Sequence, residues 1–170
     1  SKPAAASEGA SASGAGIAVI TTTTMKAEAA HDTSAFVDDG VTLTLSGNLT
    51  ATATSTPSST PRSNRGAGAG LLAFSATTIS TELGGETGAW IGDRGNISAE
   101  NVTLDATATH LAQGQSTTTQ GSLIVTITSV DSRAVDNGTA SVRIGAESGG
   151  QGTTVLSRGA ITATASMNST

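Results

Sequence analysis

The sequence contains no cysteine and no tyrosine among its 170 residues, and its only aromatic side chains are Phe36, Phe74 and Trp90. The absence of cysteine excludes disulfides, thiolate metal ligands and cysteine nucleophiles. With so few large rings, a core dominated by aromatic packing is also excluded. Any interior must therefore be thin and filled by small aliphatic side chains.

Charge is scarce as well, since charged residues make up 12% of the chain, with a net charge of −5 and a sequence pI of about 4.8. No cluster of Lys or Arg provides the electrostatic footprint of a nucleic-acid-binding protein, so we expect no nucleic-acid partner. No apolar run approaches the length of a transmembrane helix, and we expect no membrane span.

The chain begins with a low-complexity stretch of small residues. Residues 1–13 are mostly Ala, Ser and Gly, which predicts a flexible lead-in. This start has neither the charged region nor the apolar region of a signal peptide. We interpret the sequence as a mature subunit or a fragment of a longer chain.

Three related copies follow, over residues 14–66, 67–120 and 121–170. An offset of 54 residues takes Phe36 to Trp90 without a gap, and an offset of 53 takes Ile91 to Ile144. Each copy has a short apolar strand, a Gly/Asp turn, a second strand and an alternating run rich in Thr and Ala. The polar stretches 57–65 and 114–121 are predicted as loops, and the third copy has a longer loop at 147–154.

A repeat of about 54 residues without helical periodicity predicts a β-solenoid with a narrow continuous core. Because 54 divides into two coils of about 27, we expect a parallel β-helix of about six coils, with Leu, Val, Ile and Ala facing inward. An antiparallel β-sandwich is the alternative, since short strands separated by Gly and Asn turns also describe that class. Insertions at one place per repeat and Ala-rich inward positions favour the solenoid.

Three motifs carry a resemblance to a known family: Gly-Ala-Gly-Ile at 14–17, Ala-Trp-Ile-Gly-Asp at 89–93 and the following segment 95–106. They resemble repeats of large bacterial filamentous adhesins of the haemagglutinin-like and leukotoxin-like kind, over most of residues 14–168. The resemblance implies a right-handed parallel β-helix, secretion, and a structural or adhesive role at the cell surface. The first and third copies depart from the pattern, with Asp38 where Gly would stand and a Gly-rich loop at 147–152.

Five of the six asparagines lie in Asn-x-Ser/Thr sequons. As candidate N-glycosylation sites they would mark exposed turns of a secreted protein. The alternative is that Asn simply favours turns in a chain saturated with Ser and Thr. The candidate acceptors are Asn48, Asn96, Asn101, Asn137 and Asn168.

The alternating run of each copy presents Thr on its predicted outer side. Such regular ranks bind ice in some solenoids, whereas the simpler interpretation is that Thr suits a solvated strand. Asp105 interrupts the rank and Ser166 ends it. The predicted Thr face consists of Thr50, Thr52, Thr54, Thr103, Thr107, Thr162 and Thr164.

The acidic residues at turns have oxygen atoms suited to Ca²⁺, namely Asp38, Asp39, Asp93 and Asp136. The Gly-Gly-x-Gly-x-Asp repeat of calcium-binding β-rolls is absent, so we interpret them as turn residues and expect no metal or cofactor. His31 and His110 are predicted as solvated turn residues. With no Gly-x-Ser-x-Gly motif and no aromatic sugar platforms, we predict no catalytic residues and no enzymatic activity.

These patterns together predict a structural extracellular protein: an adhesin stalk segment or a self-assembling filament subunit. The alternative is a binding module that uses the Thr face for ice or a glycan, and a β-helical carbohydrate enzyme is a third hypothesis. The expected partners are further copies stacked end to end, further repeats of the same chain, or host or cell-surface glycans, because open solenoid ends carry unpaired backbone groups.

Overall fold

The computed structural model describes residues 4–5, 8–13, 16–146 and 148–170, and its regular elements there are all β-strands. No helix long and apolar enough to cross a bilayer occurs in these ranges. The strands are β1 (Ala4–Ala5), β2 (Glu8–Ser13), β3 (Gly16–Ala30), β4 (Thr33–Val37), β5 (Thr42–Thr44), β6 (Leu49–Ser55), β7 (Ser58–Ser59), β8 (Arg62–Gly84), β9 (Glu86–Ile91), β10 (Asn96–Ala99), β11 (Val102–Ala112), β12 (Gln115–Asp136), β13 (Thr139–Ile144), β14 (Thr154–Ser157) and β15 (Ile161–Ser169).

The strands form four sheets, and every pairing assigned to the described residues is parallel. The sheets are β6–β11–β15 with β7 and β1, β5–β10–β14, β4–β9–β13, and β8 between β12 and both β2 and β3. Each strand pairs with the corresponding segment of a neighbouring repeat, which runs in the same direction. The antiparallel β-sandwich alternative is therefore wrong.

The registers follow the whole repeat. Thr50 lies opposite Thr103, and Thr103 lies opposite Thr162, so that partners are separated by 53 and 59 residues. The predicted division into two coils of about 27 residues does not match these registers. The chain instead runs through the four sheets once per repeat, and we call these runs the first pass (residues 4–55), the middle pass (58–110) and the third pass (111–170).

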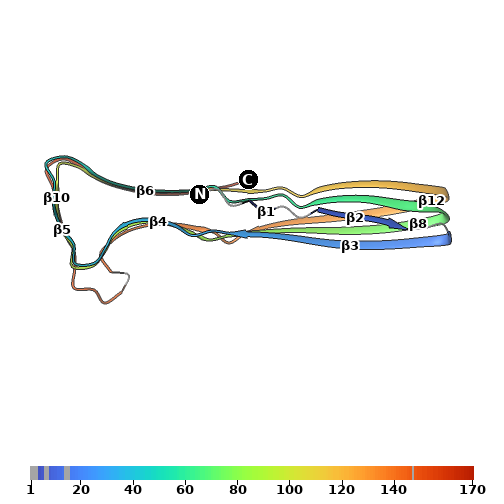
Figure 1. The fold of residues 1–170 in the computed structure, drawn as a ribbon, viewed down its shortest axis with the longest axis horizontal. Coiled ribbons are helices and arrows are strands. Elements are labelled where there is room, and N and C mark those ends of the chain that lie inside the picture. Colours follow the sequence, from blue (N-terminus) through green and yellow to red (C-terminus); the bar gives the residue numbers. More distant parts are fainter. Residues whose placement is uncertain (1–3, 6–7, 14–15, 147) are drawn as a thin grey trace.

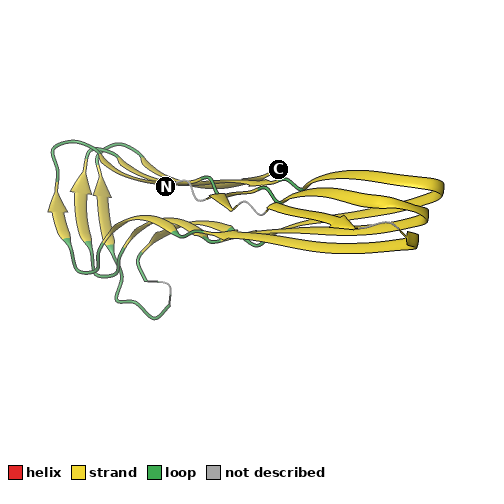
Figure 2. Cartoon of the chain, turned by 45° about the vertical axis from the view of Figure 1, so that its right-hand side comes forward, coloured by secondary structure: helices red, strands yellow, loops and turns green. Residues whose placement is uncertain are grey.

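The passes form a long, flattened loop in which equivalent strands overlie one another (Figure 1). Strand β6 and its partners run along one long side and β4 with its partners along the other, while β5 and β10 close one end and β8 and β12 turn back at the opposite end. The tilted view separates the three passes as neighbouring ribbons (Figure 2). The interior therefore lies between two facing layers of strands.

The inward side chains of the middle pass form the core, as the alternating pattern predicted. Ile91 and Leu104 are completely buried, because a neighbouring pass covers them on each side. In β3 the predicted inward residues Val19 and Met25 are buried, whereas Ile17 is exposed. The main cluster comprises Ala51, Ala89, Ile91, Ile97, Ala99, Val102, Leu104 and Ala106.

Three segments differ from the sequence prediction. Residues 4–5 and 8–13 of the expected flexible lead-in form β1 and β2, whereas residues 1–3 and 6–7 lie outside the described part. The predicted loops at 57–65 and 114–121 contain β7 and the beginnings of β8 and β12. Pairing with a neighbouring pass overrides the weak local preference of these Ser- and Gly-rich segments. The longer loop of the third copy is present over residues 145–146 and 148–153.

Candidate functional site

The structure brings all predicted Thr-face residues onto the outer side of one sheet, formed by β6, β11 and β15. Their ranks are in register as Thr50–Thr103–Thr162, Thr52–Asp105–Thr164 and Thr54–Thr107–Ser166. The threonines of the first and third passes are exposed, and those of the middle pass are half-buried between neighbours. The Ser166 hydroxyl lies 3.4 Å from Thr107 Oγ1, which lies 3.5 Å from Asp105 Oδ1.

The candidate glycosylation sites occupy different environments. The Asn101 amide nitrogen donates to Asn48 Oδ1 at 2.9 Å, and Asn101 Oδ1 accepts from the Ala160 N–H at 2.9 Å. The amide nitrogen of Asn137 donates to Glu82 at 3.2 Å. In Asn101 and Asn137, the atom that would carry a glycan therefore already makes a hydrogen bond. Asn96 and Asn168 have exposed side chains on β10 and β15.

The predicted turn role of Asp39 and Asp93 is confirmed. Asp39 Oδ1 accepts from the Asp93 N–H at 2.8 Å, and the Asp93 carboxylate accepts from the N–H groups of Gln151 and Gly152, both at 3.0 Å. The Gln151 N–H is the main cause that lowers the pKa of Asp93 below its ordinary value. One carboxylate thus ties each pass to the next at this turn. The N–H of Asp39 is instead satisfied within its own pass by Asp38 Oδ1 at 2.8 Å.

The prediction that His110 is a solvated turn residue is wrong. Its side chain is 2% exposed and projects from β11 to the end of β12, where Nδ1 lies 2.6 Å from Asp136 Oδ1. The same carboxylate oxygen accepts the Gly138 N–H at 3.0 Å. A Cβ at residue 138 would overlap the His110 ring, so the absence of a side chain there makes room for the imidazole. This pair joins the middle and third passes across the interior.

Burial by itself raises the pKa of the Asp136 carboxyl group. The hydrogen bonds from Gly138 and His110 outweigh burial, and the pKa of Asp136 lies below its ordinary value. The carboxylate is therefore charged at neutral pH and fixes the orientation of the imidazole. His31 lies elsewhere, half-buried at the end of β3, where its N–H donates to the Gly84 carbonyl at 3.3 Å.

An aromatic and cationic stack on the outer face of β4, β9 and β13 was not predicted. The Phe36 and Trp90 rings stack with centroids 5.2 Å apart and an interplanar angle of 9°, and the Arg143 guanidinium lies 5.6 Å from the Trp90 ring. The equal offset of Phe36 and Trp90 in the repeat was the available signal. Gly88 is needed beneath this stack, because a Cβ there would come within 2.7 Å of the Trp90 ring. A hollow of about 400 Å³ beside the stack is lined by Glu86, Trp90, Ser141, Val142 and Arg143.

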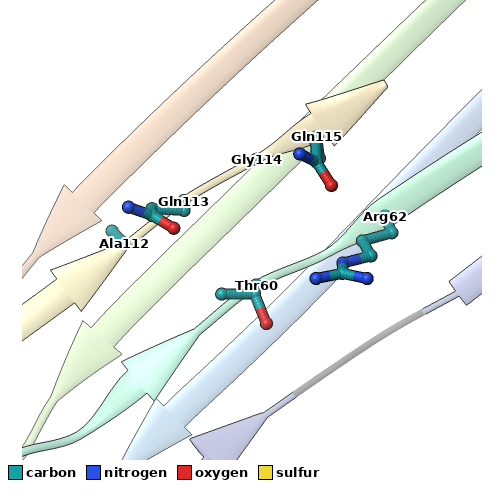
Figure 3. A pocket seen from close by; sticks show the side chains of 6 residues that line it. All are labelled: Thr60, Arg62, Ala112, Gln113, Gly114 and Gln115. Carbon is teal, nitrogen blue, oxygen red and sulfur yellow. The ribbon is translucent and has the colours of Figure 1, made fainter. Parts of the chain in front are cut away.

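A second hollow, of about 420 Å³, lies where β8 and β12 begin. Figure 3 shows Thr60 and Arg62 on one strand segment, facing the neighbouring segment that carries Gln113 and Gln115. Hydroxyl, amide and guanidinium groups line it, so this surface can form hydrogen bonds, but its lining residues include no carboxylate or imidazole for proton transfer. Within the described ranges, no three His, Asp or Glu side chains lie close enough together to hold a metal ion.

No family model, curated protein or solved structure matches this chain. The assignment of a function therefore depends on the registers, surfaces and contacts described above.

Proposed function

We propose that this chain is a structural segment of an extracellular fibre at the cell surface, built as a right-handed parallel β-helix. It serves as a stalk segment of an adhesin or as a subunit of a self-assembling filament. Its role is to hold a stiff, regular shape, and it has no catalytic activity.

One observation carries this proposal: equivalent residues of the three repeats lie opposite one another in all four sheets. A chain whose every pass repeats the preceding one builds an object that is extended by adding passes, and nearest-neighbour contacts supply its stability. The hydroxyl-rich outer surface and the absence of cysteine are compatible with this role outside the cell. The right hand follows the preference of parallel crossover connections.

Immunogold electron microscopy on intact cells of the source organism tests the proposal. Antibodies raised against the 170-residue chain should label fibres on the outer surface, and antibodies absorbed with the purified chain should not. Label confined to the cell interior would contradict the proposal. The intact mass of the native protein would show in the same material whether Asn96 and Asn168 carry glycans.

The Thr face supports a second candidate function, the binding of ice or a glycan. Three ranks in register present hydroxyl groups about 4.8 Å apart between strands and roughly 6.6 Å apart along each strand. Asp105 interrupts this array at its centre. If the face binds ice, Asp105→Thr should increase the thermal hysteresis of a dilute solution, and Thr103→Lys should abolish it. Unchanged freezing behaviour in all three proteins would exclude ice as the ligand.

A further inference from the structure

The third pass leaves the interior open. Its inward side chains are 40–51% exposed, at Val130, Ile144, Ile161 and Met167. The residues opposite them in the middle pass are at most 1% exposed, at Thr77, Ile91, Val102 and Ala108. The fold thus ends on a row of half-covered apolar side chains above unpaired strand edges, and such a surface is a template for another strand layer.

The charges at the two ends of the stack are complementary. Within the chain, Lys26 of the first pass pairs with Glu82 of the middle pass at 3.2 Å. Glu82 lies opposite Glu28, so this pair is diagonal, two residues further along the neighbouring strand. Arg133 and Lys26 both lie opposite Ser80. A first pass placed on the third pass in the same register would put Glu28 on the same diagonal from Arg133.

A second charge pair obeys the same geometry. Asp131 of the third pass and Thr24 of the first pass both lie opposite Thr78. On the same diagonal, Asp131 would face Lys26 of the added pass. Both charges of the third-pass strand would therefore meet opposite charges.

The aromatic stack also continues across such a contact. Arg143 lies over Trp90 on one side, and Phe36 occupies the equivalent position in the first pass, opposite Trp90. Phe36 is 55% exposed. A first pass added to the third would place a Phe36 ring next to Arg143, so that the guanidinium would lie between two rings, an arrangement favoured by cation–π attraction.

The turns do not obstruct this contact. The third pass lacks an aspartate equivalent to Asp39 and Asp93, but the first pass does not need one, because Asp38 satisfies the Asp39 N–H. The longer loop between β13 and β14 protrudes sideways from the outline of the passes and not along the stacking direction (Figure 1).

We propose that the third pass of one copy binds the first pass of a second copy, in the register that joins successive passes within the chain. This contact, which we call the seam, is heterologous and does not close on itself, so it generates a filament. It places Ile161 on Leu49 and Ile144 on Val37 of the next copy. The inference rests on the proposed structural function and names its partner.

Cysteine cross-linking tests the seam, because the protein has no cysteine of its own. Thr52 and Thr164 are exposed and both lie opposite Asp105, two strand spacings apart within one chain. That separation, about 9.6 Å, exceeds the roughly 7 Å limit for a disulfide. Across the seam they lie directly opposite each other. Mild oxidation of Thr52→Cys/Thr164→Cys should therefore give a ladder of covalent oligomers on a non-reducing gel.

The controls fix register and polarity. The single variants Thr52→Cys and Thr164→Cys should remain monomers on the gel, and Thr52→Cys/Thr162→Cys, displaced by two residues, should cross-link far less. At low ionic strength, Arg133→Glu should weaken association roughly tenfold, and adding Glu28→Arg should restore it, since the charges are then exchanged. Circular dichroism should confirm that every variant is folded.

Dimers of either single-cysteine variant would show a head-to-head contact and overturn the seam. A folded double variant that forms no ladder would also overturn it, and would mean that a different segment or protein covers the third pass. In that case immunogold label on surface fibres would still support a stalk role. Absence of both results would remove the seam and the structural function together.

Discussion

At the scale of single residues, the direction of each side chain decides its environment. Leu104 and Thr103 are neighbours in β11, yet Leu104 is fully buried and Thr103 contributes to the outer Thr face. This difference follows from the two-residue periodicity of a strand. It could be predicted from the sequence because Leu, Val and Ala alternate strictly with Thr and Asp over residues 102–108.

We predict opposite outcomes for the same substitution at these two positions. Leu104→Asp would bury an unpaired charge between passes, at a cost of several kcal/mol that approaches the whole stability of a domain. Thr103→Asp should change the free energy of unfolding by about 1 kcal/mol or less, because its side chain faces outward. Urea unfolding followed by circular dichroism measures both. A folded Leu104→Asp protein with an unchanged midpoint would contradict the assigned inward face.

The contact between His110 and Asp136 was beyond sequence reasoning for a physical reason. The two residues are 26 positions apart and on different strands, so only the path of the chain through the sheets brings them together. A lone histidine in a polar sequence carries no local signal of burial.

We predict that this pair makes stability dependent on pH. The pKa of Asp136 is lowered from 3.8, so its contribution is present above that value and is lost as pH falls through the lower pKa of the folded protein. Asp136→Asn should reduce the free energy of unfolding by roughly 1–3 kcal/mol at pH 7, with a smaller difference from the wild type below about pH 4. Asp105→Asn, on the outer face, is the matched control. Equal losses at pH 7 and pH 3 would refute the role of the carboxylate charge.

At the scale of strands and turns, side chains of one pass bind the backbone of the next. Asp93 does so at one corner and Asn101 at another, where its oxygen accepts the Ala160 N–H. These turns were predictable from their Asp, Asn and Gly content, but their contacts between passes were not. The left-handed position of the Asp turn is filled by Gly40 at φ 69° in the first pass and by Arg94 at φ 55° in the middle pass.

We predict that the corner at Asn101 contributes measurably to stability. Asn101→Ala removes one hydrogen bond to each neighbouring pass and should lower the free energy of unfolding by roughly 1–3 kcal/mol. Asn101→Asp retains the acceptor for Ala160 but loses the donor to Asn48, so its effect should be smaller at neutral pH. Urea midpoints of the three proteins would settle the order. An Asn101→Asp variant less stable than Asn101→Ala would argue against the acceptor role.

The number of passes was mispredicted because the longest strands were not anticipated. Short strands and frequent turns were expected, which favoured two coils per repeat. Strand β8 instead spans 23 residues and β12 spans 22, including their Gly-rich and Ser-rich portions. Small residues permit a bend without ending the pairing, and their polarity imitates a loop. Composition alone cannot distinguish these cases, whereas the repeat offset could be predicted correctly.

At the scale of the whole molecule, stability should vary across the stack. Middle-pass strands have neighbours on both sides, whereas the inward side chains of β15 are open at one end. Local opening is easiest where buried contacts are fewest.

We predict that β9 and β11 are the last to exchange their amide hydrogens and that β15 is among the first. Hydrogen exchange with mass spectrometry on dilute protein would measure this order. Uniform protection of the three passes at a concentration where the protein is monomeric would contradict it.

The loop between β13 and β14 has a practical consequence. Pairing between the middle and third passes shifts from an offset of 53 before the loop to 58 and 59 after it, and the strands on both sides remain aligned. Extra length is therefore expelled at one corner without disturbing the stack. This corner is a natural insertion point, where foreign peptides could be grafted and displayed once per copy.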